Sequence, residues 1–161
     1  MRNIIFTSIL SVLAYPVAAD APLGCFSRTY SDSHLAKNPE QIVRSMALEI
    51  YKDPTYGDIV ASMGVEFADQ GRIKNTASAG QFMDQYLVCW EQDGTFGCSV
   101  ECDGGVFSVS RRAADSITIA TEGLVVGEVD GCGGAESIAE VFGKVVKYKL
   151  YKAEPAACVW N

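Results

Sequence analysis

Two cysteines on either side of a hairpin signal constrain this chain more than any other feature. Cys89 and Cys98 flank Asp93-Gly94, a dipeptide that favours a type I′ turn because both central positions need a positive φ. Counting outward from the turn places Cys89 opposite Cys98 at a non-hydrogen-bonded pair, where Cα atoms lie roughly 4.5 Å apart. A disulfide tolerates that distance, so the sequence predicts a hairpin closed by a Cys89–Cys98 bridge.

Hydrophobic alternation with a period of two runs through the rest of the chain and predicts about eight short strands. The expected strands are 23–30, 44–52, 59–68, 81–92, 95–102, 106–110, 116–121 and 144–152. Turn signals separate them, and no repeat or linker indicates a second domain. The expected fold class is all-β, an antiparallel meander that is barrel-like or a sandwich, braced by disulfides.

One or two short helices are expected between the strands. Ser31, Asp32 and Ser33 offer caps for a helical turn over 34–38, and the pattern at 136–142 fits two turns of helix. The segment 69–81 is expected to be a loop, and loops of that length are often functional or mobile. The core face of the hairpin is expected to carry Leu87, Cys89, Phe96, Cys98, Val100 and Cys102.

The first residues are typical of a secretory signal. Arg2 precedes an apolar stretch at 4–12, and Val17-Ala18-Ala19 forms a small-residue cleavage site. Residues 1–19 are therefore expected to be removed, which leaves 20–161 as a single β domain in the periplasm or outside the cell. The apolar stretch is shorter than the roughly 20 residues that span a bilayer, so no stable membrane anchor is expected. A retained anchor and lipidation at Cys25 are the alternatives.

All six cysteines lie in the expected mature chain, and an even number in an exported protein indicates a disulfide framework. The four cysteines outside the hairpin allow three connectivities. We prefer Cys25–Cys158, which ties the first strand to the tail, and this leaves Cys102–Cys132. Zinc is not favoured, because the chain has no Cys-x-x-Cys and a single histidine.

The order Tyr30-Ser-Asp-Ser-His-Leu-Ala-Lys-Asn-Pro39, then Cys98-Ser-Val-Glu-Cys-Asp-Gly-Gly105 and a cysteine near the C-terminus, resembles small exported proteins of proteobacteria with no established activity. The resemblance covers about a third of the chain. It implies an exported bacterial protein with this cysteine frame, and it implies no catalytic residue.

The net charge of −7 argues against nucleic acid or anionic lipid as a partner, because no basic stripe offsets it. Lys147 and Lys149 on the last strand are interpreted as protection of an edge strand. Arg111-Arg112 is interpreted as a solvated pair at a hairpin tip, with carboxylate or phosphate binding as the alternative. Tyrosines and tryptophans in the strands are expected to pack in the core or across strands, with a pocket or a partner surface as the alternative; these are Tyr86, Trp90, Tyr148, Tyr151 and Trp160.

Few residues are candidates for chemistry. His34 is the single histidine and is expected to be a surface residue of the capped turn. Glu101 and Asp103 share the outward face of a strand and, with Asp130, are candidates for Ca²⁺ or for glycoside hydrolysis. Turn chemistry at Asp103-Gly104-Gly105 explains the same residues, so we expect Asp103 to accept backbone hydrogen bonds and Glu101 to be solvated.

No catalytic, cofactor-binding or metal-binding residue is assigned on this basis. The sequence favours an exported, non-enzymatic envelope protein that binds a small ligand or a protein partner. The alternative is a small hydrolase that uses carboxylates such as Glu101 and Asp103, with or without a metal.

Overall fold

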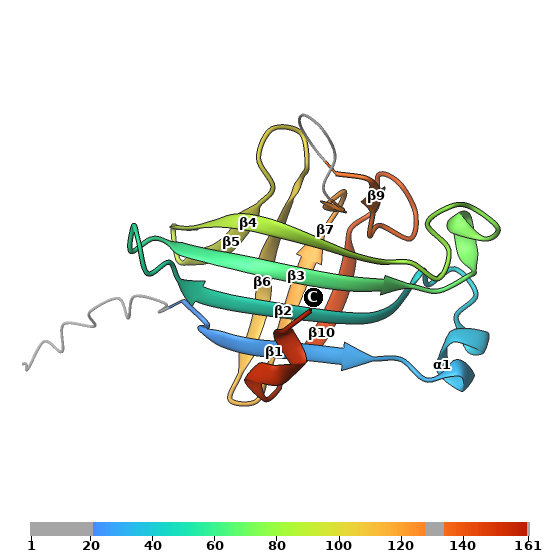
Figure 1. Ribbon diagram of the computed structural model, residues 1–161, viewed down its shortest axis with the longest axis horizontal. Coiled ribbons are helices and arrows are strands. Elements are labelled where there is room, and N and C mark those ends of the chain that lie inside the picture. Colours follow the sequence, from blue (N-terminus) through green and yellow to red (C-terminus); the bar gives the residue numbers. More distant parts are fainter. Residues whose placement is uncertain (1–20, 128–133, 161) are drawn as a thin grey trace, which may run out of the picture.

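A computed structural model of the chain describes residues 21–127 and 134–160. Eight antiparallel strands form one barrel (Figure 1). They are β1 (Gly24–Thr29), β2 (Val43–Lys52), β3 (Ile59–Phe67), β4 (Phe82–Gln92), β5 (Thr95–Ser99), β6 (Val106–Ala113), β7 (Ser116–Thr121) and β10 (Val146–Lys152). Strands β1 to β7 pair in chain order, and β10 pairs with both β7 and β1 to close the barrel. The expected meander is confirmed, and of the two expected architectures the chain adopts the barrel.

The hairpin of β4 and β5 has the predicted register. Gln92 pairs with Thr95, and Cys89 pairs with Cys98. Asp93 has a φ of 50° and Gly94 a φ of 72°, as a type I′ turn requires. The Cys89–Cys98 disulfide is present, with its Cα atoms 3.9 Å apart, slightly closer than the ordinary spacing of a non-hydrogen-bonded pair.

Side chains fill the inside of the barrel. An eight-stranded barrel is just wide enough for its inward side chains to meet across the axis. The alternation seen in the sequence selects these residues, and the largest of them are almost fully buried: Met46, Leu48, Ile50, Met63, Phe67, Leu87, Phe96, Phe107, Ile119 and Tyr148. The interior is therefore a hydrophobic core formed by all eight strands.

The two ends of the barrel are closed differently. One end, called the turn end, carries the short turns 53–58, 93–94 and 114–115. The other end, called the covered end, carries longer connections (Figure 1). These include the helix α1 (Asp32–Lys37), the 3₁₀ helix Gly71–Ile73 and a two-stranded sheet of β8 (Val125–Val126) and β9 (Glu136–Ser137).

Apolar side chains from those connections close the covered end, and we call the segments around Ile73, 124–126 and 136–139 the plug. Ile73, Leu124, Val126 and Ile138 are each at most 1% exposed. The loop 69–81, expected to be functional or mobile, therefore supplies part of the core through Ile73.

Two elements differ from the sequence-based expectation. The segment 136–142 does not form a helix: Glu136 and Ser137 pair with β8, and Val141 and Phe142 are exposed. Strand β6 does not end at Ser110 but continues to Ala113 through a β-bulge between Val109 and Arg111. In both segments the structure depends on which strand each one pairs with, and the local pattern of hydrophobic residues does not indicate the pairing partner.

The predicted Cys25–Cys158 disulfide is also present. It ties β1 to the 3₁₀ helix Pro155–Cys158, which follows β10. The third predicted bridge, Cys102–Cys132, includes Cys132, which lies outside the described residues. No described cysteine is free, Cys102 included. Cys102 is exposed and does not lie on the core face, because β5 ends at Ser99.

Candidate functional site

The carboxylates singled out in the sequence do not form a site. Glu101 and Asp103 are both exposed, and Asp103 accepts no hydrogen bond among the described residues. The turn is held by the backbone instead, since the Val100 amide donates to the Gly105 carbonyl at 3.0 Å. Gly104 packs against the side chain of Val100 so closely that a Cβ there would collide with it. Within the described residues the backbone and Gly104 hold this turn, and the expected capping role of Asp103 stays a prediction.

No group of three or more histidine, cysteine or acidic residues is placed to hold a metal ion within residues 21–127 and 134–160. Asp130, the third carboxylate considered for Ca²⁺, lies outside these ranges. His34 has a structural role in α1: Ser31 caps the helix by accepting a hydrogen bond from the His34 amide. The His34 ring lies 3.0 Å from Oε1 of Gln41 through Nε2, and it packs on Tyr30.

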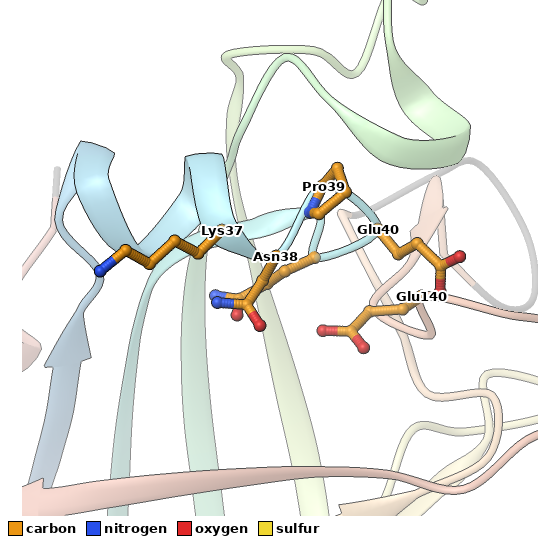
Figure 2. A pocket seen from close by; sticks show the side chains of 6 residues that line it. Lys37, Asn38, Pro39, Glu40 and Glu140 are labelled. Carbon is orange, nitrogen blue, oxygen red and sulfur yellow. The ribbon is translucent and has the colours of Figure 1, made fainter.

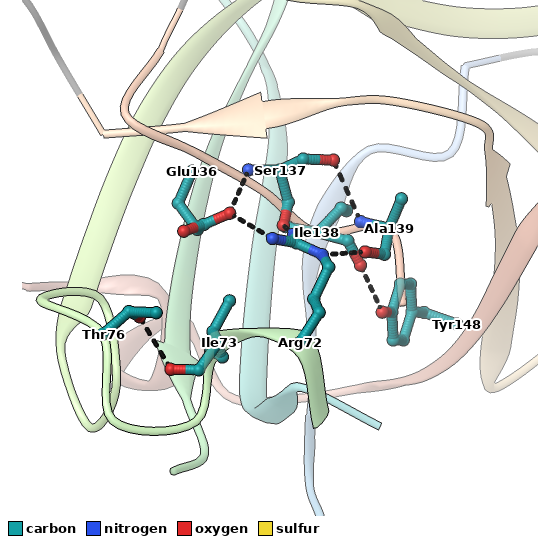
Figure 3. A network of polar contacts seen from close by, with 8 residues as sticks. All are labelled: Arg72, Ile73, Thr76, Glu136, Ser137, Ile138, Ala139 and Tyr148. Atoms are coloured by element: carbon teal, nitrogen blue, oxygen red, sulfur yellow. Dashed lines mark hydrogen bonds and ion pairs between the residues drawn. The ribbon is translucent and has the colours of Figure 1, made fainter. Parts of the chain in front are cut away.

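An arginine organises the covered end (Figure 3). The Arg72 guanidinium donates to the Ala139 carbonyl at 2.8 Å, to a Glu136 carboxylate oxygen at 2.6 Å and to the Ser137 carbonyl. Burial raises the pKa of Glu136, but hydrogen bonds from Arg72 and Ser78 and the arginine charge outweigh it and bring the pKa below its usual value. The Tyr148 hydroxyl donates to the Ile138 carbonyl at 2.7 Å from inside the barrel. These contacts supply hydrogen-bond donors to the backbone carbonyls of Ser137, Ile138 and Ala139, and so they stabilise the plug.

Beside the plug lies a hollow of about 380 Å³. Its lining is polar: Lys37, Asn38, Pro39, Glu40, Gln41 and Glu140. Figure 2 shows the carboxylates of Glu40 and Glu140 on the same side of the hollow, while Lys37 points away from them. Burial raises the pKa of Glu140, and the negative charge of Glu40 raises it further. A carboxylic acid whose pKa is raised in this way, with a second carboxylate beside it, is the minimum that acid–base hydrolysis needs. Sequence patterns do not indicate this pair, because its members are 100 residues apart.

A row of uncharged residues crosses the outside of β4 to β7, bordered by Lys147 of β10 and Glu122. The register places Trp90, Gly97, Ser108 and Ala120 side by side across these four strands. The Trp90 indole lies directly over Gly97, where a Cβ would come within 2.6 Å of the ring. Exposed valines stand beside the row, Val106 at 45% exposure and Val145 at 59%.

We call this surface the outer-wall face; it consists of Trp90, Val106, Ser108, Ala120 and Val145. It encloses a shallow hollow of about 230 Å³, with Thr121 and Glu122 at its rim. Exposed Tyr86 and Val88 continue it along β4. The sequence indicates Trp90 and Tyr86 as possible partner-surface residues but does not indicate Ser108 or Ala120, because only the cross-strand register brings them into one row with Trp90.

The other aromatic candidates lie on different sides of the barrel wall. Tyr148 is buried in the core, whereas Tyr151 is exposed. Trp160 crosses the outside of the barrel near Gly64, donates through Nε1 to Asp84 at 3.2 Å and packs near Phe82.

No family model, no curated protein and no solved structure matches this chain. None of the helices in the described ranges has the length and apolar character needed to cross a bilayer.

Proposed function

We propose that this chain is an exported, non-enzymatic binding protein that contacts a protein partner through the outer-wall face. The observation that supports this proposal most is the exposure of Trp90, Val106 and Val145 around an uncharged floor of Ser108 and Ala120. Contacts between proteins have centres that are depleted of charge and enriched in aromatic residues. A contiguous exposed apolar surface on a folded chain is typical of such a contact.

The filled interior supports an external site. Barrels that carry a small ligand inside leave space along the axis, whereas here the inward side chains from β2, β3, β4, β6 and β7 form one buried cluster. Two disulfides support an oxidising compartment. Export of this chain, with cleavage after Ala19, is part of the proposal, and N-terminal sequencing that begins at Asp20 would support it.

Site-specific crosslinking tests the proposed face. A photoreactive amino acid at Val106 should give a discrete crosslinked partner in the producing cells. The matched control is Glu49, outward on β2 and four strands away from β6 in either direction around the barrel. Ala120→Arg, which places a charge on the floor of the face, should abolish the crosslink. Equal crosslinking at Val106 and Glu49, or none at either, would contradict the proposal.

The alternative is a carboxylate-dependent hydrolase, and its structural basis is the Glu40 and Glu140 hollow rather than Glu101 and Asp103. The raised pKa of Glu140 favours a general acid there. Turnover of a glycoside or ester panel by the wild-type chain, lost in Glu140→Gln and retained in Glu101→Gln, would establish the hydrolase. Absence of turnover across the panel is the result expected from the binding function.

A further inference from the structure

A second hollow lies on the outside of the barrel near the turn end, and it is lined by two cations. Arg111 of β6 pairs with Thr118 of β7, and Thr118 pairs with Lys149 of β10. Thr118 lies between the buried Ile117 and Ile119, so its side chain points outward. Arg111 and Lys149 therefore flank the Thr118 side chain on the outer surface. The hollow between them is about 160 Å³ and also includes Ala113, Asp115 and Ser116.

A β-bulge creates this arrangement. Val109 pairs with Ile119, and the next residue of β7, Thr118, pairs with Arg111 rather than with Ser110. Without the extra residue, Arg111 would lie opposite Ile117 and face the core. The bulge turns Arg111 to the outside and places Arg112 inward, where its guanidinium lies 5.6 Å from the centre of the Phe96 ring. Bulges of this kind re-aim side chains, often next to binding sites.

Neither Arg111 nor Lys149 forms an ion pair with another residue of the described part of the chain. The ion pairs between described residues are Arg44–Asp32 and Arg72–Glu136. Lys149 packs over the Tyr151 ring, with Nζ 4.8 Å from the ring centre, which restricts the side chain without cancelling its charge. Asp115 lines the same hollow and accepts a hydrogen bond from the Ser116 hydroxyl at 3.2 Å. On a chain with a net charge of −7, two unpaired cations side by side are a local exception.

We propose that Arg111, Thr118 and Lys149 form a binding notch for a phosphate group. A guanidinium offers paired donors to a tetrahedral oxyanion, an ammonium adds a point charge, and the hydroxyl adds a third donor. The phosphate comes from a soluble phosphate compound or from a phospholipid headgroup, which present the same chemistry to the notch. The notch and the outer-wall face are separate sites, so each can fail without the other.

Titration of the mature protein with inorganic phosphate, followed by amide NMR at constant ionic strength against chloride, tests the notch. Shifts should saturate at the amides around Arg111, Thr118 and Lys149. Arg111→Gln and Lys149→Gln should each weaken phosphate binding by about fivefold, the upper range for one exposed ion pair. Asp115→Asn should strengthen it, because a carboxylate in the same hollow repels the anion.

Lys147→Gln is the matched control, since Lys147 is outward on the same strand but pairs with Ala120 and does not line the notch. Unchanged binding in this variant supports a defined site. Shifts that never saturate, or an equal loss in Lys147→Gln, would show diffuse charge screening and overturn the proposal. Vesicles of phosphatidylglycerol against phosphatidylcholine then distinguish the sources: vesicle binding lost in Arg111→Gln assigns a headgroup, and binding of free phosphate alone assigns a soluble compound.

Discussion

Gly97 lies beneath the indole of Trp90, and its lack of a side chain is what lets the ring lie flat on the outside of β5. An added Cβ would come within 2.6 Å of the indole and 2.7 Å of the Phe107 carbonyl oxygen. Gly97→Ala should therefore lower the free energy of unfolding by about 1–3 kcal/mol, the usual cost of forcing atoms into a packed site. Urea denaturation measures this loss.

Gly123→Ala is the matched control for that measurement, because no atom lies within 4 Å of its added Cβ. In a Trp90→Ala background, Gly97→Ala should still destabilise, since the Phe107 carbonyl remains in place. Equal and small losses of unfolding free energy in Gly97→Ala and Gly123→Ala would mean that the Trp90 indole does not pack against β5 at Gly97.

Glu140 gives the covered end a pH dependence. Burial and the charge of Glu40 raise the pKa of Glu140 in the folded chain. At low pH both the folded and the unfolded chain hold this proton, so the group has no effect. As the pH rises through the ordinary glutamate pKa, the unfolded chain releases its proton first, and the folded state loses relative stability. Glu140→Gln should therefore raise the Tm at pH 7.

Thermal unfolding between pH 4 and pH 7 checks this prediction. The increase in Tm caused by Glu140→Gln should become smaller toward pH 4. Glu136→Gln should act in the opposite direction at pH 7, because the pKa of Glu136 is lowered by its contacts with Arg72. A gain from Glu140→Gln that is independent of pH would point to packing instead of charge.

At the scale of elements, one side chain joins the loop 69–81 to the plug around β9. Arg72 donates to Glu136, Ser137 and Ala139 from its partly buried guanidinium. Arg72→Ala removes the side-chain donor to the Ser137 and Ala139 carbonyls and the cation paired with Glu136, and it should cost about 2–4 kcal/mol of unfolding free energy. Arg72→Lys should recover less than half of the loss, because an ammonium cannot reproduce the planar fork.

Denaturant unfolding measures the loss of unfolding free energy in Arg72→Ala, and hydrogen exchange shows which part of the chain loses protection. The amides of Ala135 and Ile138 should exchange faster in Arg72→Ala, while those of β2 and β3 should keep their protection. Lys74→Ala, an exposed position in the same loop, should leave both measurements unchanged. Loss of protection throughout the barrel would show that the plug and the barrel unfold as one unit.

For the whole molecule, the seam between β1 and β10 is where the barrel closes, and it is short. Two residue pairs join these strands, Phe26 with Lys152 and Ser27 with Tyr151, against six pairs between β1 and β2. Arg28 adds one hydrogen bond to the Lys149 carbonyl at 3.3 Å. The Cys25–Cys158 disulfide anchors the chain after β10 to β1, so it holds the seam covalently.

The two described disulfides should therefore differ in their effect on stability. Cys25 and Cys158 are separated by 133 residues and Cys89 and Cys98 by 9. On the loop-entropy account, removing the long-range bridge as a Cys25→Ala and Cys158→Ala pair should cost about 4–5 kcal/mol. Removing the hairpin bridge as a Cys89→Ala and Cys98→Ala pair should cost about 2–3 kcal/mol. Guanidinium unfolding without reductant compares the two, and a larger loss from the hairpin pair would contradict this account.

The sequence by itself determined the features that depend on neighbouring residues. The Asp93-Gly94 turn set the register of β4 and β5, and with it the Cys89–Cys98 bridge, because a two-residue turn leaves one way to pair the strands. Alternation selected the inward residues of β2 and β3, because successive side chains of a strand point to opposite faces.

Only the tertiary structure decided what depends on pairing between distant strands. The bulge in β6 reverses the face of Arg111, and a local pattern does not report which residue lies opposite. The pairing of β8 with β9 replaced a helix that amphipathic spacing favoured at 136–142. The outer-wall face and the notch around Thr118 both arise from side chains on three or more strands. Their positions follow from closing the barrel, because closure fixes the register of every strand at once.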